Sequence, residues 1–204
     1  KQAIARVVAD LLPANCTLMI NGGSTCVEVA RALRGRRLSV ITNSVTVAGL
    51  FASELASEVT LVGGYVYPRI GVAVGAMAER QVEALHATHF VTSCAAVNGD
   101  GAFESNQMLV DIERLMMRNA DRVILAADHH KLGLRSVVKL CELSDVDVIV
   151  TDAGADPGVR EWLRSLNTRV VFAGEEARGQ GQGPRYAQPP DLSPWPRLDH
   201  EMSQ

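Results

Sequence analysis

The sequence is poor in the features that mark metal-binding, disulfide-stabilised or membrane-spanning proteins. It has only four cysteines (Cys16, Cys26, Cys94 and Cys141), which lie far apart and form no Cys-x-x-Cys pair. That spacing argues against a zinc site and against a small disulfide framework. Long apolar runs are missing too, since the longest are of strand length and are broken by Gly, Asn or Asp. We expect a cytoplasmic protein with reduced, mostly buried thiols, no metal site and no membrane contact.

The chain also lacks an excess of basic residues. It has 20 Lys and Arg against 23 Asp and Glu, for a formal net charge of -3. Nucleic-acid binding depends on clustered Lys and Arg that displace counterions. We therefore expect any contact with DNA to come from another module. The chain opens in helical rhythm without a methionine, which suggests that a segment upstream has been removed.

The composition predicts one folded domain followed by a tail. With 204 residues, of which 47% are apolar, the chain can build one good core. From about residue 174 the sequence becomes rich in Gly, Gln and Pro, which is typical of a disordered segment. The prediction is a folded domain over residues 1–173 and a low-complexity tail over 174–204.

Apolar runs of strand length alternate with amphipathic segments of helix length. The predicted strands are Thr17–Ile20, Leu38–Ile41, Val59–Val62, His89–Ser93, Val123–Ala126, Val146–Val150 and Arg169–Phe172. Two helices are well marked: one from Pro157 to Leu166, capped by Asp156, and one from about Gln107 to Asn119, with an apolar stripe that includes Met108 and Met116. This alternation predicts an α/β fold with a Rossmann-like, mostly parallel sheet and helices on both faces. Ligands of such sheets bind beyond the carboxyl ends of the strands.

The most informative stretch runs from Leu18 to Glu28. It reads as a buried strand that passes through two glycines, Gly22 and Gly23, directly into a helix. Glycines allow close backbone approach, and the first free amides of a helix attract an anion. Ser24 and Thr25 add hydroxyls, and Thr25 with Glu28 has the spacing of a capping box. The stretch suggests a phosphate site, although a plain strand-to-helix turn accounts for it equally well when it is taken alone.

Other polar groups follow predicted strands. They are Thr42, Asn43 and Ser44 after the second strand, Gly63 and Gly64 after the third, Asp128 to Gly133 after the fifth, and Thr151 with Asp152 after the sixth. Taken singly, Thr-Asn-Ser is an ordinary helix cap and Gly-Gly an ordinary turn. Their shared position at one edge of the sheet favours a ligand site.

These motifs together, with Gly75 and Asp128-x-x-Lys131-x-Gly133, resemble the C-terminal effector-binding domain of DeoR-family transcriptional regulators over residues 1–173. The resemblance implies a fold similar to ribose-phosphate isomerases and CoA transferases, an N-terminal winged helix-turn-helix that binds operator DNA, and a homo-oligomer that senses phosphorylated sugars. It makes Asn21, Gly22, Gly23, Ser24 and Thr25 the phosphate loop. It makes Thr42, Asn43, Ser44, Gly63, Gly64, Asp128 and Asp152 further ligand-facing residues, with Lys131 as a cation near the ligand. No cofactor is implied.

The chain departs from the family pattern where the hydroxyls of a sugar would be read. Asn21 stands where the family usually has Asp, Leu109 and Glu113 stand where it commonly has Glu and Lys, and Cys94-Ala95 replaces a Ser-Gly pair. Glu113 is expected to be solvated on the polar side of its helix. His129 and His130 are open to a ligand role or a structural one.

Two other functions, isomerase and dinucleotide binding, fit the sequence less well. An isomerase of the ribose-phosphate kind needs a carboxylate base, and Asn21, Glu113 and the Cys94–Val97 strand end argue against one. A dinucleotide-binding domain would show Gly-x-Gly-x-x-Gly, which Gly22-Gly23 lacks. Asp100 and Glu104 could accept sugar hydroxyls, but Gly-Asp-Gly is also an ordinary turn. The sequence thus favours a non-catalytic sensor. That the regulator is a repressor is implied by the family resemblance alone.

Overall fold

The computed structural model describes residues 1–175, and the predicted tail, apart from its first two residues, lies outside them. The seven predicted strands form one sheet. Their bounds are β1 Thr17–Ile20, β2 Ser39–Thr42, β3 Glu58–Leu61, β6 His89–Thr92, β9 Val123–Ala126, β11 Val148–Asp152 and β12 Arg169–Ala173. The strand order is β12-β11-β9-β6-β1-β2-β3, and every neighbouring pair is parallel. The predicted α/β fold with a parallel sheet is confirmed.

The order of the strands reverses between β1 and β6. From β1 the chain adds β2 and β3 on one side, and from β6 it adds β9, β11 and β12 on the other. The connections therefore leave β1 and β6 in opposite directions at the carboxyl edge. Parallel sheets bind ligands at this kind of switch point.

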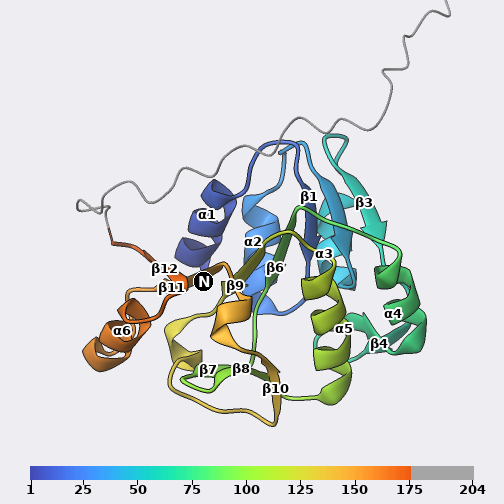
Figure 1. The fold of residues 1–204 in the computed structure, drawn as a ribbon. Coiled ribbons are helices and arrows are strands. Elements are labelled where there is room, and N and C mark those ends of the chain that lie inside the picture. Colours follow the sequence, from blue (N-terminus) through green and yellow to red (C-terminus); the bar gives the residue numbers. More distant parts are fainter. Residues whose placement is uncertain (176–204) are drawn as a thin grey trace, which may run out of the picture. The chain divides into compact units, whose positions relative to one another are not determined.

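Helices cover both faces of the sheet. Their bounds are α1 Gln2–Leu11, α2 Ser24–Ala32, α3 Val45–Phe51, α4 Ala76–Glu83, α5 Gln107–Arg118 and α6 Pro157–Arg164. Successive strand residues point to opposite faces, so Leu18 and Ile20 join a core with α1, α2 and α3, whereas Met19 joins a core with α4 and α5. Figure 1 shows the strands in the middle, with α1 on one side and α4 and α5 on the other.

Several short elements were not predicted. They are the strands β4 Tyr65–Tyr67, β5 Val72–Val74, β7 Ala96–Asn98, β8 Gly101–Glu104 and β10 Val138–Cys141, and the 3-10 helices η1 His129–Lys131 and η2 Leu143–Asp145. β4 pairs with β5, and β10, β8 and β7 form an antiparallel sheet. The turn from Asn98 to Gly101 joins β7 to β8, as the turn interpretation of Gly-Asp-Gly expects. Pairing between separate segments, rather than a local apolar run, forms these short strands.

The two marked helices form, with differences in detail. α6 starts with Pro157 after the N-cap Asp156, as predicted, and ends at Arg164. In α5 the predicted apolar stripe is displaced: Met108 is exposed, and the buried face consists of Leu109, Val110, Ile112, Glu113 and Met116. The prediction that Glu113 is solvated is therefore wrong.

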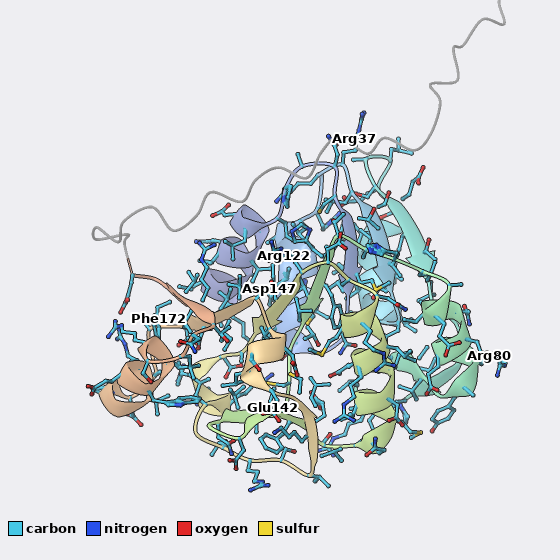
Figure 2. The ribbon with its side chains drawn as sticks, in the orientation of Figure 1. Arg37, Arg80, Arg122, Glu142, Asp147 and Phe172 are labelled. Atoms are coloured by element: carbon cyan, nitrogen blue, oxygen red, sulfur yellow. The ribbon has the colours of Figure 1, made fainter. Side chains whose placement is uncertain are left out.

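The amino edge of the sheet, opposite the predicted site, is held by an ion pair. Arg122 precedes β9 and Asp147 precedes β11, and they lie close together in Figure 2. The guanidinium donates to Asp147 at 2.7 Å, and the other carboxylate oxygen accepts from the Val123 amide at 2.8 Å. All four cysteines are free and buried, as predicted. Within residues 1–175, no helix has both the length and the apolarity that spanning a bilayer would require.

Candidate functional site

The loop after β1 needs both of its glycines. A Cβ on Gly22 would lie 2.2 Å from Cγ1 of Val72, so no larger residue fits there without movement of β5. Gly23 has a φ of +90° and is the N-cap of α2. Side chains rarely adopt that conformation, although the space around Gly23 is open. The chain thus turns from strand to helix within two residues and presents the start of α2 at the carboxyl edge.

The amino end of α2 has no side-chain cap. Gly23 supplies none, so the predicted capping box of Thr25 and Glu28 is wrong. Thr25 instead lies inside the first turn, where its hydroxyl is fully buried and has no hydrogen-bond partner. Ser24 is exposed at the helix start. Free amides at a helix end, with two hydroxyls beside them, have the donors that an anion requires.

The residues after β2 mainly hold neighbouring elements together. The Thr42 hydroxyl donates to the Ile20 carbonyl at 2.6 Å, and the Ser44 hydroxyl caps α3 by accepting from the Val47 amide. Asn43 Nδ2 donates to the Ala73 carbonyl at 3.1 Å, which ties the loop to β5. Asn43 Oδ1 is buried without a partner. The helix-cap interpretation of Thr-Asn-Ser is confirmed, and Asn43 Oδ1 is the acceptor that the loop leaves available.

Gly63 and Gly64 pack against α4. Gly63 exchanges two hydrogen bonds with the side-chain amide of Gln81, at 3.1 and 2.9 Å. A Cβ on Gly64 would approach Ala78 to 3.1 Å. Close packing of α4 on the end of β3 thus explains Gly64, whereas a Cβ on Gly63 would come no nearer than 3.8 Å to Gln81.

The segment after β9 folds back toward the switch point. Asp128 caps η1, since its Oδ1 accepts from the His130 amide at 3.2 Å. η1 then directs Lys131 toward β6, where its Nζ donates to the Ser93 hydroxyl at 2.8 Å. Asp128 Oδ2 is buried without a hydrogen bond and lies 3.5 Å from Nζ of Lys1. Lys131 is therefore placed beside β6, next to the strand that carries the glycine loop.

Asp152, at the end of β11, fixes the position of His129. Its carboxylate meets Nδ1 of His129 at 2.6 Å and accepts from the His129 and Gly154 amides at 3.2 and 2.9 Å. Partial burial acts to raise the pKa of Asp152, but these bonds outweigh it and lower the pKa below its ordinary value of 3.8. Because Nδ1 is engaged, Nε2 is the ring nitrogen of His129 that remains for a ligand.

An open groove of about 570 Å³ runs along this edge of the sheet. It brings together the start of α1, the start of α2, η1 and the end of β11. Its lining residues are Lys1, Gln2, Ala3, Ser24, Glu28, Asp128, His129, His130 and Asp152. Three sequence-predicted residues, Ser24, Asp128 and Asp152, thus share one groove. Among residues 1–175, no group of three or more His, Cys, Asp or Glu side chains is arranged to hold a metal ion.

A second set of polar groups is buried beneath the glycine loop. Asn21 Nδ2 donates to Glu113 Oε1 at 2.6 Å, and Asn21 Oδ1 accepts from the Gly22 amide at 2.7 Å. Glu113 is 1% exposed, and Glu104 of β8 is 9% exposed. Burial raises the pKa of both carboxyl groups, the nearby charge of Glu104 raises that of Glu113 further, and Lys131 acts in the opposite direction on each. A signal in the sequence pointed to Glu113: it lies four residues after Leu109 and three before Met116, on the buried face of α5.

Five buried side-chain atoms in the described part of the chain have no hydrogen-bond partner: Thr25 Oγ1, Asn43 Oδ1, Glu113 Oε2, Asp128 Oδ2 and Thr151 Oγ1. Asn43, Asp128 and Thr151 lie at or just after the carboxyl end of a strand of the main sheet. Thr25 lies in the first turn of α2, and Glu113 is bonded to Asn21, which follows β1. Burying a polar atom without a partner costs free energy. Their concentration at one edge is typical of a site that a polar ligand completes.

The chain was compared with known proteins. A model of the DeoR C-terminal sensor domain matches residues 1–153. The transcriptional repressor CsqR of Escherichia coli is 31% identical over 87% of this chain and 69% of its own length. The glycerol-3-phosphate regulon repressor of E. coli is 30% identical over 80% of this chain and 66% of its own length.

The fold also has a solved counterpart. The structure of eIF2B beta from Chaetomium thermophilum superposes with a TM-score of 0.50 and 10% identity, over 72% of this chain and 47% of that one. At this identity the likeness concerns the fold alone. The family match and the two repressors lead to one conclusion: this chain belongs to the DeoR family of transcriptional regulators, whose C-terminal sensor domain spans residues 1–153.

Proposed function

We propose that this domain binds a phosphorylated sugar or a related phosphorylated metabolite at the carboxyl edge of its sheet, and that binding controls the grip of an N-terminal helix-turn-helix module on operator DNA. The observation that carries the proposal is the convergence of three anion-binding features at the switch point. They are the uncapped amino end of α2, the unpartnered hydroxyl of Thr25, and the ammonium group of Lys131 beside β6. A phosphate takes helix-end amides, hydroxyls and a lysine as partners.

The names of the relatives support the same class of effector. One is a repressor of a glycerol-3-phosphate regulon, and glycerol 3-phosphate is a small phosphorylated polyol. In our proposal the phosphate binds to Gly22, Gly23, Ser24, Thr25 and Lys131. Asp128 and Asp152 lie at the ends of β9 and β11 on one side of β1, and Asn43 follows β2 on the other side, so they flank the proposed phosphate position along the edge.

Transmission to DNA requires a conformational equilibrium. An effector shifts DNA affinity only if it binds one arrangement of the protein better than another. We propose that the domain acts in a homo-oligomer, whose subunit arrangement is the property that changes. The direction of the response, release or capture of the operator, follows from which arrangement binds the effector better.

Catalysis is the second candidate, and one observation favours it. Glu113 is a buried carboxyl group with a raised pKa, which is a property of general bases. The relatives, however, are named as repressors. The hydrogen bonds from Asn21 to Glu113 and from the Gly22 amide to Asn21 also connect Glu113 to the glycine loop. We therefore infer a sensor. Incubation with ribose 5-phosphate should give no ribulose 5-phosphate, and turnover would favour the enzyme.

A thermal-shift screen tests the proposal. The chain is heated with a panel of sugars and polyols, their phosphate esters, and inorganic phosphate. A ligand that binds only the folded state raises the melting temperature. We expect one or more esters to stabilise the protein while their unphosphorylated parents do not. Equal stabilisation by ester and parent, or no response to any phosphate, would count against a phosphate site.

A further inference from the structure

The buried groups beneath the glycine loop carry more acid than base. Glu113 of α5 and Glu104 of β8 share their surroundings with one cation, Lys131, whose Nζ already donates to Ser93. The charges that act on Glu113 are those of Glu104 of β8 and Lys131 of η1. The other titratable groups around the cluster are the thiols of Cys26 of α2, Cys94 after β6 and Cys141 of β10, whose pKa values burial and the nearby Glu113 raise. Excess buried acid is costly unless a proton or a ligand compensates it.

One oxygen of Glu113 is held in place and the other is left over. Oε1 accepts from Asn21 at 2.6 Å, whereas Oε2 is enclosed and has no partner in the structure. Asn21 in turn accepts from the Gly22 amide at 2.7 Å. The unpartnered acceptor is therefore two hydrogen bonds away from the backbone of the glycine loop. Glu113 therefore lies close beside the loop on which the proposed phosphate sits.

We propose that Glu113, with Glu104 behind it, forms an acidic subsite that accepts a hydrogen bond from a donor group, a hydroxyl or an ammonium, on the part of the effector that does not carry the phosphate. This rests on the proposed function, which supplies the phosphate end. The donor replaces the proton that burial favours on this carboxyl group, so Oε2 of the ionised form accepts its hydrogen bond, whereas a ligand acceptor in the same place is repelled by the carboxylate. Glu113 thereby selects among phosphate esters, whereas the loop selects for phosphate.

The test compares affinities of wild-type protein and the Glu113→Gln variant by titration calorimetry. The probes are inorganic phosphate, glycerol 3-phosphate, glucose 6-phosphate and glucosamine 6-phosphate. Gln keeps an oxygen for Asn21 and places an NH₂ donor where Oε2 was. We expect the gain in affinity of the preferred ester over inorganic phosphate to fall roughly 10- to 100-fold, the range for a hydrogen bond to a charged group, while the affinity for inorganic phosphate stays unchanged.

The control is Asp111→Asn, which makes the same change of charge two residues earlier on α5, where Asp111 accepts a hydrogen bond from Gln107 at the surface. This variant should behave as wild type. If Glu113→Gln does not fold, as judged by circular dichroism, Glu104→Gln takes its place and should show the same selective loss. An ester whose advantage over inorganic phosphate survives in the folded variant overturns the subsite.

One further readout follows the proton. Titration in buffers of different ionisation enthalpy reports proton release: a hydroxyl or ammonium donor that replaces a proton on the acidic pair releases that proton to the buffer. If inorganic phosphate binds and no ester binds better, the subsite is overturned while the phosphate site stands. If neither phosphate nor any ester binds, the proposed function is overturned along with it.

Discussion

Asn21 and Glu113 are joined by a 2.6 Å hydrogen bond, although 92 positions of sequence separate them. The bond connects the end of β1 to the middle of α5. Asn21 is also bonded to the Gly22 amide, so the glycine loop and the helix are linked through a single side chain. A ligand that shifts the loop would act on α5 through this link.

The buried carboxyl of Glu113 gives a prediction about pH. Its pKa in the folded protein is raised above 4.5, so the folded state binds this proton more tightly than the unfolded chain does. Protonation of Glu113 therefore stabilises the folded state fully below about pH 4.5, and this stabilisation is lost as the pH rises through the pKa that Glu113 has in the folded protein. The Glu113→Gln variant lacks this loss. Its free energy of unfolding, measured by urea denaturation between about pH 5 and about pH 8, should increase relative to that of wild type as the pH rises. A difference independent of pH would mean that Glu113 is ionised in the fold.

Removing the two hydroxyls at the start of α2 should separate binding from stability. Thr25 Oγ1 has no partner and Ser24 is exposed, so Ser24→Ala combined with Thr25→Ala breaks no hydrogen bond found in the structure. We expect the double variant to keep its circular dichroism spectrum and to lose effector binding in the thermal-shift assay. Thr168→Ala, which removes a hydroxyl at the opposite edge of the sheet, serves as the control. Unchanged affinity in the double variant would refute the phosphate loop.

Lys131 should matter for phosphate and little for the rest of the ligand. The Lys131→Ala variant loses a positive charge beside Ser93, and a phosphate is the ligand group that such a charge holds. Calorimetry should show the affinity for a phosphate ester falling about tenfold or more, the effect of losing one charge-assisted hydrogen bond, with a much smaller change for the parent sugar. Lys139→Ala, which removes a surface lysine paired with Glu142, is the matched control. Equal weakening of ester and parent would place Lys131 away from the phosphate.

The two glycines of the loop should respond differently to alanine. A Cβ on Gly22 meets Val72 at 2.2 Å, whereas a Cβ on Gly23 meets no atom but must adopt a φ of +90°. Strain at Gly23 costs about 1–3 kcal/mol, since a φ of +90° with a ψ of 158° is a region that essentially only glycine occupies. Overpacking at Gly22 costs about 1–3 kcal/mol when neighbours must shift. Chemical denaturation should therefore show both variants destabilised, and Val72→Ala, which removes the clashing methyl group, should restore part of the loss in Gly22→Ala and none in Gly23→Ala. Equal effects of Val72→Ala on the two variants would mean that the contact with Val72 does not confine the loop.

The sequence predicted the main sheet well because its central strands β1, β6, β9 and β11 are buried on both faces. A continuous apolar run such as Val123–Ala126 leaves little ambiguity when helix-length segments separate it from the next run. The short strands β4, β5, β7, β8 and β10 were missed, since pairing between distant segments, rather than local periodicity, forms them.

The candidate site was predicted in part. Placing polar residues after strands located the edge, and the fold brings Ser24, Asp128 and Asp152 into one groove there. The prediction that Glu113 is solvated was wrong because it rested on the charge of the residue and not on its position in the helix. Glu113 continues the buried spacing of Leu109 and Met116. Hydrogen bonds such as Asn21 to Glu113 and Lys131 to Ser93 depend on which helix covers which strand end. Local sequence carries no record of that.

The most direct test of a phosphate site at the switch point is a crystal structure of the protein with the phosphate ester that gives the largest thermal shift. The account predicts the phosphate at the amino end of α2, within hydrogen-bond reach of the Ser24 and Thr25 amides and hydroxyls and of Lys131, with the other end of the ester toward Glu113. A phosphate bound elsewhere, with these groups unoccupied, would contradict it.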